Sequence, residues 1–138
     1  FVDAMCILKD AKNVEEALVN LTNLSPSQRK NRIAELMEQT GLSKSLLDTP
    51  VRKLSGGEQR RLALLRSLSI SPEFLILDEV TAGLDLISTE AVLQLLEKYE
   101  QEHDCAYLVI THDIQVASRL CEVIYEIEHG KFTKKAVR

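Results

Sequence analysis

The most informative stretch of this 138-residue chain is Leu54-Ser55-Gly56-Gly57-Glu58-Gln59-Arg60-Arg61. Apolar residues at helical spacing follow it, so it predicts the start of a helix. A Ser-Gly-Gly at such a start offers a hydroxyl and unobstructed backbone N–H groups at the positive end of the helix dipole. The octapeptide therefore predicts an anion site, against the simpler interpretation of a serine N-cap with a glycine-rich first turn.

Composition describes an ordinary globular domain, with 45% apolar and 28% charged residues. The net charge of −4 argues against a nucleic-acid surface, because such surfaces are basic. Cys6, Cys105 and Cys121 are odd in number and lack paired metal spacing, which favours reduced thiols over a disulfide framework. No apolar run approaches the length of a membrane span, so any crossing of a membrane would fall to another subunit.

The remaining elements follow from periodicity and turn signals. Helices are predicted over residues 13–24, 26–40, 55–71, 88–101 and 114–120, and strands over 74–77, 106–110, 123–127 and 131–133. The first two strands are short continuous apolar runs, which predicts burial on both faces. Strand, helix, strand, helix in this order indicates an α/β fold with parallel strands, preceded by purely helical segments.

Polar residues follow both apolar strands. Phe74-Leu75-Ile76-Leu77-Asp78-Glu79 is a strand that ends in two carboxylates, and Thr111-His112-Asp113 comes directly after the next strand. In open α/β sheets ligands bind at this carboxyl edge. Taken singly, an acidic turn or a histidine after a strand is usually a surface feature, so the argument depends on their combination.

In this order and spacing, these stretches resemble the ATP-binding cassette (ABC) ATPases. The octapeptide resembles the family's signature sequence, and the strand ending at Asp78-Glu79 resembles its Walker B motif. Ala82-Gly83-Leu84-Asp85 is similar to the D-loop, and Thr111-His112-Asp113 to the switch-histidine loop. The resemblance implies a partial P-loop NTPase sheet of the RecA-like type over residues 72–138, with an ABC helical subdomain over residues 1–71.

The resemblance also implies ATP and Mg²⁺ as cofactors. The implied site residues are Ser55, Gly56, Gly57, Gln59 and Asp85 for nucleotide binding, Asp78 for the metal, and Glu79 and His112 for catalysis. The signature would bind ATP held by the opposite subunit. Glu79 would orient the attacking water, and His112 would contact the γ-phosphate.

Several positions depart from the family pattern. The five glycines, at 41, 56, 57, 83 and 130, form no Gly-x-x-x-x-Gly-Lys-Ser/Thr, so the P-loop and its strand are missing from this sequence. We expect them upstream, and we expect this piece to be inactive alone, with Leu108 to Ile110 as a bare apolar edge. Val2 would occupy the place of the Q-loop glutamine, and Val80 stands where the family usually has proline.

The resemblance implies the ATP-binding subunit of an ABC transporter at the cytoplasmic face of a membrane. Residues 1–5 and 14–18 are similar to the oligopeptide, dipeptide and nickel importer branch. The implied partners are a second cassette, transmembrane permease subunits and the missing amino-terminal half, without nucleic acid. Two alternatives stay open: a non-transport ABC ATPase, and a catalytically silent partner that supplies its signature in trans.

Overall fold

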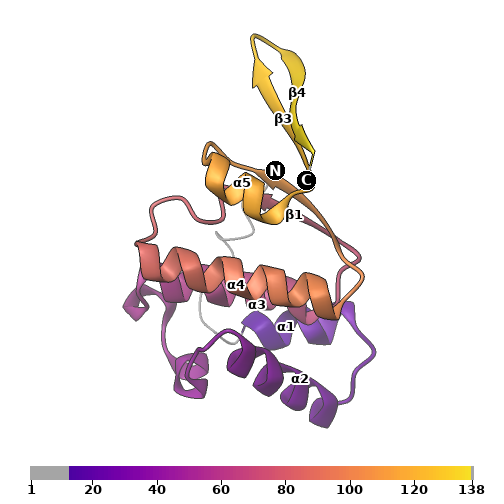
Figure 1. The fold of residues 1–138 in the computed structure, drawn as a ribbon. Coiled ribbons are helices and arrows are strands. Elements are labelled where there is room, and N and C mark those ends of the chain that lie inside the picture. The colour runs from indigo at the N-terminus through magenta and orange to yellow at the C-terminus, as the bar shows by residue number, and fades with distance from the viewer. Residues whose placement is uncertain (1–12, 138) are drawn as a thin grey trace.

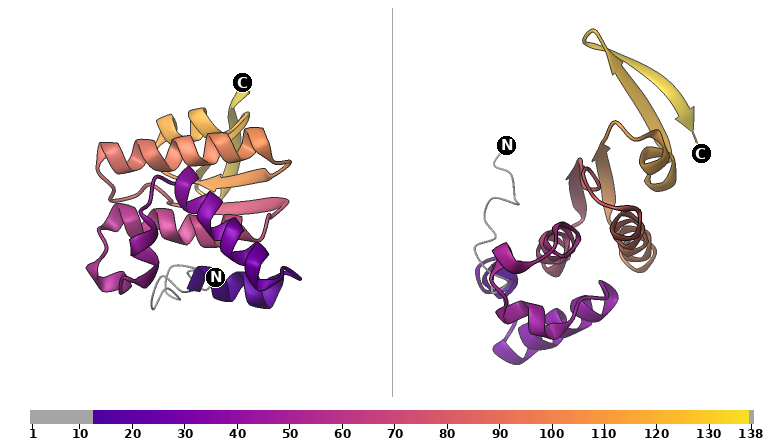
Figure 2. Two further views of the ribbon diagram at one scale, coloured as in Figure 1. Left: turned by 90° about the horizontal axis from the view of Figure 1, so that it is seen from below. Right: turned by 90° about the vertical axis from the view of Figure 1, so that its left-hand side faces the viewer.

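The computed structural model describes residues 13–137, which form five α-helices, a two-stranded parallel sheet and a β-hairpin that stands away from them (Figures 1 and 2). The helices are α1 (Asn13–Leu21), α2 (Pro26–Gln39), α3 (Gly56–Ser69), α4 (Leu86–Glu102) and α5 (Ile114–Leu120), with short 3₁₀ turns η2 (Lys44–Asp48) and η3 (Val51–Lys53). The strands are β1 (Phe74–Asp78), β2 (Ala106–Ile110), β3 (Val123–Glu128) and β4 (Lys131–Val137). Every predicted helix and strand is confirmed; α5 and β2 have the predicted bounds, and the others differ at one or both ends.

The first helix ends earlier than predicted, at Leu21 rather than at residue 24. The Thr22 hydroxyl donates to the carbonyl of Leu18 at 2.6 Å and accepts from the amide of Leu24 at 3.4 Å. Threonine thereby replaces the backbone bonds of a further turn, as short polar side chains do at helix ends.

The segment between α2 and α3, for which no helix or strand was predicted, holds both 3₁₀ turns.

Strands β1 and β2 are parallel neighbours, with Ile76 opposite Leu108 and Asp78 opposite Ile110. Helix α4 is the crossover between them, and α3 and α4 lie on the same side of both strands (Figure 2). The Tyr107 hydroxyl of β2 donates to the carbonyl of Leu96 in α4 at 2.9 Å. The packed side of this sheet is therefore the side of these two helices.

One hydrophobic cluster joins the helical part of the chain to the sheet. Its fully buried members include Val14 of α1, Leu65 of α3 and Leu96 of α4, and it continues to Leu77 of β1. The boundary predicted between residues 71 and 72 thus lies within a continuous core, and the division into two subdomains stays a prediction.

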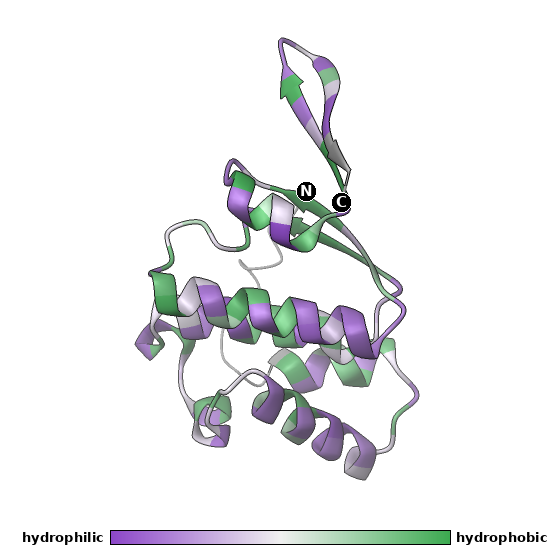
Figure 3. Cartoon of the chain, viewed as in Figure 1, coloured by the Kyte–Doolittle hydropathy of each residue, from purple (hydrophilic) through white to green (hydrophobic). Residues whose placement is uncertain are grey.

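The opposite side of the same sheet is open. Phe74, Ile76, Leu108 and Ile110 keep 56%, 42%, 48% and 48% of their surface exposed, and Figure 3 shows both strands as apolar. The prediction that these strands are buried on both faces is therefore wrong for this chain. The physical reason is that no element within residues 13–137 covers this side, and within that range β2 pairs only with β1.

Strands β3 and β4 form the predicted hairpin, which points away from the helices in Figure 1. His129 and Gly130 both have positive φ, at 48° and 75°, which suits a tight two-residue connection between twisted strands. Tyr125, Ile127 and Phe132 remain exposed on it.

Within the part of the chain that the structure describes, no helix is long and apolar enough to cross a bilayer.

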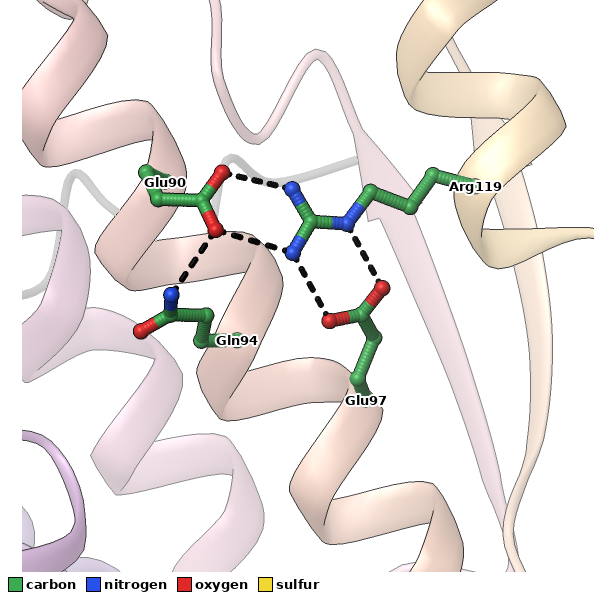
Figure 4. A network of polar contacts seen from close by, with 4 residues as sticks. All are labelled: Glu90, Gln94, Glu97 and Arg119. Atoms are coloured by element: carbon green, nitrogen blue, oxygen red, sulfur yellow. Dashed lines mark hydrogen bonds and ion pairs between the residues drawn. The ribbon is translucent and has the colours of Figure 1, made fainter.

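Helix α5 is fastened to α4 by Arg119, as Figure 4 shows. Its guanidinium contacts Glu97 through Nε at 2.6 Å and Nη2 at 2.8 Å, and Glu90 through Nη1 at 2.6 Å and Nη2 at 3.0 Å. Gln94 donates a further hydrogen bond to Glu90 at 2.8 Å. Paired bonds of this fork geometry are among the stronger polar contacts in proteins. They fix the segment that follows β2 against the crossover helix.

Candidate functional site

The carboxyl edge of the parallel sheet is shaped by an unusual backbone at Glu79. Its φ is +48°, a region that residues other than glycine seldom adopt. The Glu79 amide donates to the carbonyl of Ile110 at 2.9 Å, and its own carbonyl accepts from Ala82 at 3.0 Å. Conformations of this kind cost free energy and concentrate at functional sites. The turn carries the Glu79 side chain across to the end of β2.

Glu79 and His112 are in direct contact there. Glu79 Oε1 lies 2.9 Å from His112 Nδ1 and accepts from the His112 amide at 3.2 Å. The hydrogen bond to this carboxylate, and then its charge, raise the pKa of His112. The His112 side chain is 81% exposed, so Nε2 faces outward while Nδ1 is held. The structure thus brings both predicted catalytic residues together.

The second carboxylate oxygen of Glu79 has no such partner. Oε2 is buried, and among the described residues nothing donates a hydrogen bond to it. Buried polar atoms normally have partners, so this oxygen lacks a donor, and it has almost no surface open to solvent. The predicted role of Glu79 therefore requires a small movement that admits a water to this oxygen.

Asp78 ends β1 with an exposed residue. Within residues 13–137 no three histidine, cysteine, aspartate or glutamate side chains gather closely enough to hold a metal ion by themselves. Mg²⁺ at phosphate sites typically takes one or two carboxylates and completes its shell with phosphates and waters. A single carboxylate at Asp78 fits that pattern. It does not fit a metal site built from protein ligands alone.

The signature forms the start of α3 through a reciprocal capping box. The Ser55 amide donates to Glu58 Oε2 at 2.8 Å, and the Glu58 amide donates to Ser55 Oγ at 3.2 Å. The bond from the Ser55 backbone holds the pKa of Glu58 below its usual value. In the described part of the chain the amides of Gly56 and Gly57 have no acceptor. The predicted Ser-Gly-Gly donors are therefore available, as helix starts that bind anions require.

Two other signature side chains contact protein. Gln59 Nε2 donates to the carbonyls of Val51 and Leu54, at 3.2 and 3.0 Å, and so fastens the preceding 3₁₀ turn. Its nucleotide-binding role stays a prediction. Arg60 Nη2 donates to the carbonyl of Ala82 at 3.3 Å, which links the signature helix to the turn after β1.

Asp85 caps the next helix. Its Oδ1 accepts from the Ser88 amide at 2.9 Å, and its Oδ2 accepts from the Ser88 hydroxyl at 2.8 Å. These bonds, the one from the amide first, hold the pKa of Asp85 below its usual value. Both carboxylate oxygens thus stabilise the start of α4, and the predicted contact with nucleotide stays a prediction.

The predicted residues fall into two groups. Glu79 and His112 meet directly, whereas the signature and Asp85 are joined through two residues that the sequence analysis did not assign to the site, Ser88 and Arg60. The spacing Asp-x-x-Ser is a capping pattern and could have indicated Ser88. No local signal indicates that Arg60 reaches residue 82, because that contact depends on how α3 and α4 pack.

Comparisons with known proteins bear on this geometry. The nickel import ATP-binding protein NikE of Escherichia coli K12 is 33% identical over 141 aligned residues, which cover 99% of this chain and 53% of that relative. NikE of Shigella boydii is also 33% identical, with 97% and 52% covered. The chain therefore spans about half the length of the curated relatives it matches.

Solved structures agree with the fold. A dimeric bacterial ABC transporter cassette, MJ0796, superposes with a TM-score of 0.79 at 31% identity, covering 96% of this chain and 58% of that one. CbiO1 of Clostridium perfringens, part of the transporter complex cbiONQ, gives 0.76 at 29% identity, with 90% and 49% covered. The family model described as ABC transporter matches residues 3–82. On this match and on the 33% identity to NikE over nearly its whole length, the chain belongs to the ABC transporter family.

Proposed function

We propose that this chain is the signature-bearing part of the ATP-binding subunit of an ABC importer, where ATP bound between two cassettes is hydrolysed to drive transport. The observation that carries the proposal is the contact between Glu79 and His112 at the ends of adjacent parallel strands, 2.9 Å from Oε1 to Nδ1. A carboxylate and a histidine held together at this edge suit activation of water beside a phosphate.

The chain's own residues divide the work. Asp78 would hold Mg²⁺, which supplies charge neutralisation at the phosphates when it is bound. Glu79 would accept a hydrogen bond from the attacking water at Oε2, the oxygen that lacks a donor. The Nδ1–H of His112 donates to Glu79, and this carboxylate raises the pKa of the ring. In the protonated ring, which carries N–H on both nitrogens, Nε2 would donate to the γ-phosphate and stabilise the charge that develops there.

The signature would act on a nucleotide held by another cassette. The amides of Gly56 and Gly57 and the Ser55 hydroxyl lie at the amino end of α3, where the helix dipole favours an anion. The dimeric form in which MJ0796 was solved supports a second cassette as partner. The name of NikE supports import, and the place of CbiO1 in a transporter complex supports further subunits as partners. We expect these subunits to be the membrane permeases, with this chain at the cytoplasmic face of the membrane.

The open side of the β1–β2 sheet supports a further partner, the half of the cassette that carries the P-loop. Phe74, Ile76, Leu108 and Ile110 expose a continuous apolar surface there. A contiguous exposed apolar surface indicates a place for another part of the protein or another chain. A P-loop half that packs here would also complete the site, because Asp78 and Glu79 lie at the end of the same sheet.

Two measurements test the proposal. Calorimetric titration of the 138-residue chain with Mg-ATP should show no tight binding, since it has no P-loop. The full polypeptide that carries this chain should hydrolyse ATP, and Glu79→Gln should reduce kcat by at least about a hundredfold because it removes the water-orienting carboxylate. Glu126→Gln is the matched control, because Glu126 lies on the β3–β4 hairpin and pairs with Lys135.

The outcomes separate the alternatives. Tight Mg-ATP binding by the 138-residue chain would overturn the division of the site between two halves. Unchanged hydrolysis in Glu79→Gln would overturn the catalytic assignment. A full polypeptide that does not hydrolyse ATP, yet restores hydrolysis to a cassette whose own signature serine is replaced, would instead support the catalytically silent partner.

A further inference from the structure

The two glycines of the signature have different surroundings. A Cβ added at Gly56 would meet no atom within 4 Å. A Cβ added at Gly57 would lie 2.3 Å from Ser88 Oγ and 2.8 Å from Ser88 Cβ. Gly57 is buried, whereas Gly56 is exposed. The first turns of α3 and α4 therefore approach so closely at Gly57 that no side chain fits between them.

Ser88 is itself fixed to the turn that precedes α4. Its amide and its hydroxyl both donate to Asp85, at 2.9 and 2.8 Å. From the other side, Arg60 of α3 donates to the carbonyl of Ala82 at 3.3 Å. Residues 82–85 are thus held against α3 at both ends, by Arg60 at the start and through Ser88 at the finish.

We propose that Gly57 is a positioning residue whose missing side chain seats Ser88 against α3, so that the signature and residues 82–85 move as one unit. In function, and resting on the proposed role of the signature, a nucleotide that engages the first turn of α3 would thereby also set the position of Asp85. A rival explanation is that position 57 must be glycine so that a phosphate can approach the backbone, and this explanation does not involve Ser88. The two explanations therefore differ in what a change at Ser88 does.

The test compares four variants of the 138-residue chain without nucleotide: Gly57→Ala, Gly56→Ala, Ser88→Gly, and the double variant Gly57→Ala with Ser88→Gly. Gly57→Ala should displace Ser88, so the amide resonances of residues 82–88 should shift and their hydrogen exchange should accelerate by about tenfold or more. Gly56→Ala should leave those resonances in place. In the double variant, Ser88→Gly removes both atoms that would clash with the new Cβ, and the third neighbour, Arg61 Nη1, lies at an ordinary contact distance of 3.9 Å. Exchange in 82–88 should therefore return to the level of Ser88→Gly alone.

Each outcome decides the proposal. Equal effects of Gly56→Ala and Gly57→Ala in residues 82–88, or a double variant no better ordered than Gly57→Ala, would overturn it. If Gly57→Ala prevents folding, recovery of a dispersed spectrum in the double variant supports the proposal, and continued unfolding counts against it. Because these readouts contain no nucleotide, a negative result leaves the ATPase proposal standing, and a failed hydrolysis assay leaves this coupling standing.

Discussion

The two sides of the β1–β2 sheet are built from the same kind of residue but have opposite surroundings. Leu77 faces α3 and α4 and is 3% exposed, whereas its neighbour Ile76 faces the open side and is 42% exposed. Side chains alternate along a strand, so adjacent apolar residues sample the two environments one after the other. A fully apolar strand is therefore suited to a sheet that is covered on both sides. Residues 13–137 cover only one side of this sheet.

The largest expected effect is on the packed side. Leu77→Ala should lower the free energy of unfolding by about 2–5 kcal/mol, because it leaves a cavity in a core that cannot collapse around it. The matched variant on the open side, Ile76→Ala, should cost less, about 1 kcal/mol, because only part of that side chain is buried. Urea unfolding of both variants measures the contrast, and equal losses would show that the open side is covered in solution.

A substitution at Arg119 measures how strongly α5 is held to α4. Arg119→Met should cost about 1–2 kcal/mol, because it leaves the carboxylates of Glu90 and Glu97 facing each other without their shared partner. Lys98→Met is the control, since Lys98 meets Glu102 only at 3.8 Å on an exposed surface, and it should change stability little.

The pH dependence of that variant follows from Glu90. The hydrogen bond from Arg119 holds the pKa of Glu90 below its usual 4.5. A carboxyl with a depressed pKa contributes stability above its unfolded pKa and loses it as the pH falls through its folded pKa. The gap between the native chain and Arg119→Met should therefore be full at neutral pH and shrink in acid. A gap that is constant with pH would mean that Arg119 acts through packing alone.

Sequence reasoning reached the elements, and Glu79 and His112 as separate site residues, because each depends on local signals. The contact between the two residues follows from the pairing of β1 with β2 and was not predicted. The Ser55 cap, the apolar runs and the polar residues that follow them can be read residue by residue. The open side could not be predicted, since Phe74 and Leu75 are equally apolar and only the presence of a covering element distinguishes them. The close contact between Gly57 and Ser88 could not be predicted from the sequence either, because it depends on the distance between α3 and α4.

Polar substitution of the open side should change association more than stability. Ile76→Thr combined with Leu108→Thr should alter the free energy of unfolding by less than about 1 kcal/mol, because both side chains are already half exposed. The same variant should reduce concentration-dependent self-association in sedimentation velocity, since apolar sheet surfaces beside unpaired strand edges attract other copies. Val19→Thr, at an equally exposed position on α1, is the control. If the self-association is undiminished, it does not occur through the open side of the β1–β2 sheet.

The smallest effect is expected where the two sides meet, at the carboxyl edge of the sheet. Glu79 raises the pKa of His112 by accepting its hydrogen bond, so Glu79→Gln should move that pKa down toward the ordinary 6.5. A group with a raised pKa contributes stability below its unfolded pKa and loses it as the pH rises through the folded value. The native chain should therefore lose this small contribution on the alkaline side of 6.5, and Glu79→Gln should not. Titration of the His112 ring by NMR measures the shift, with Glu126→Gln on the distant hairpin as control. An unchanged His112 titration would mean that the pair does not form in this chain alone, so that the carboxyl edge of the sheet depends on a cover for the open side and not on the packed side.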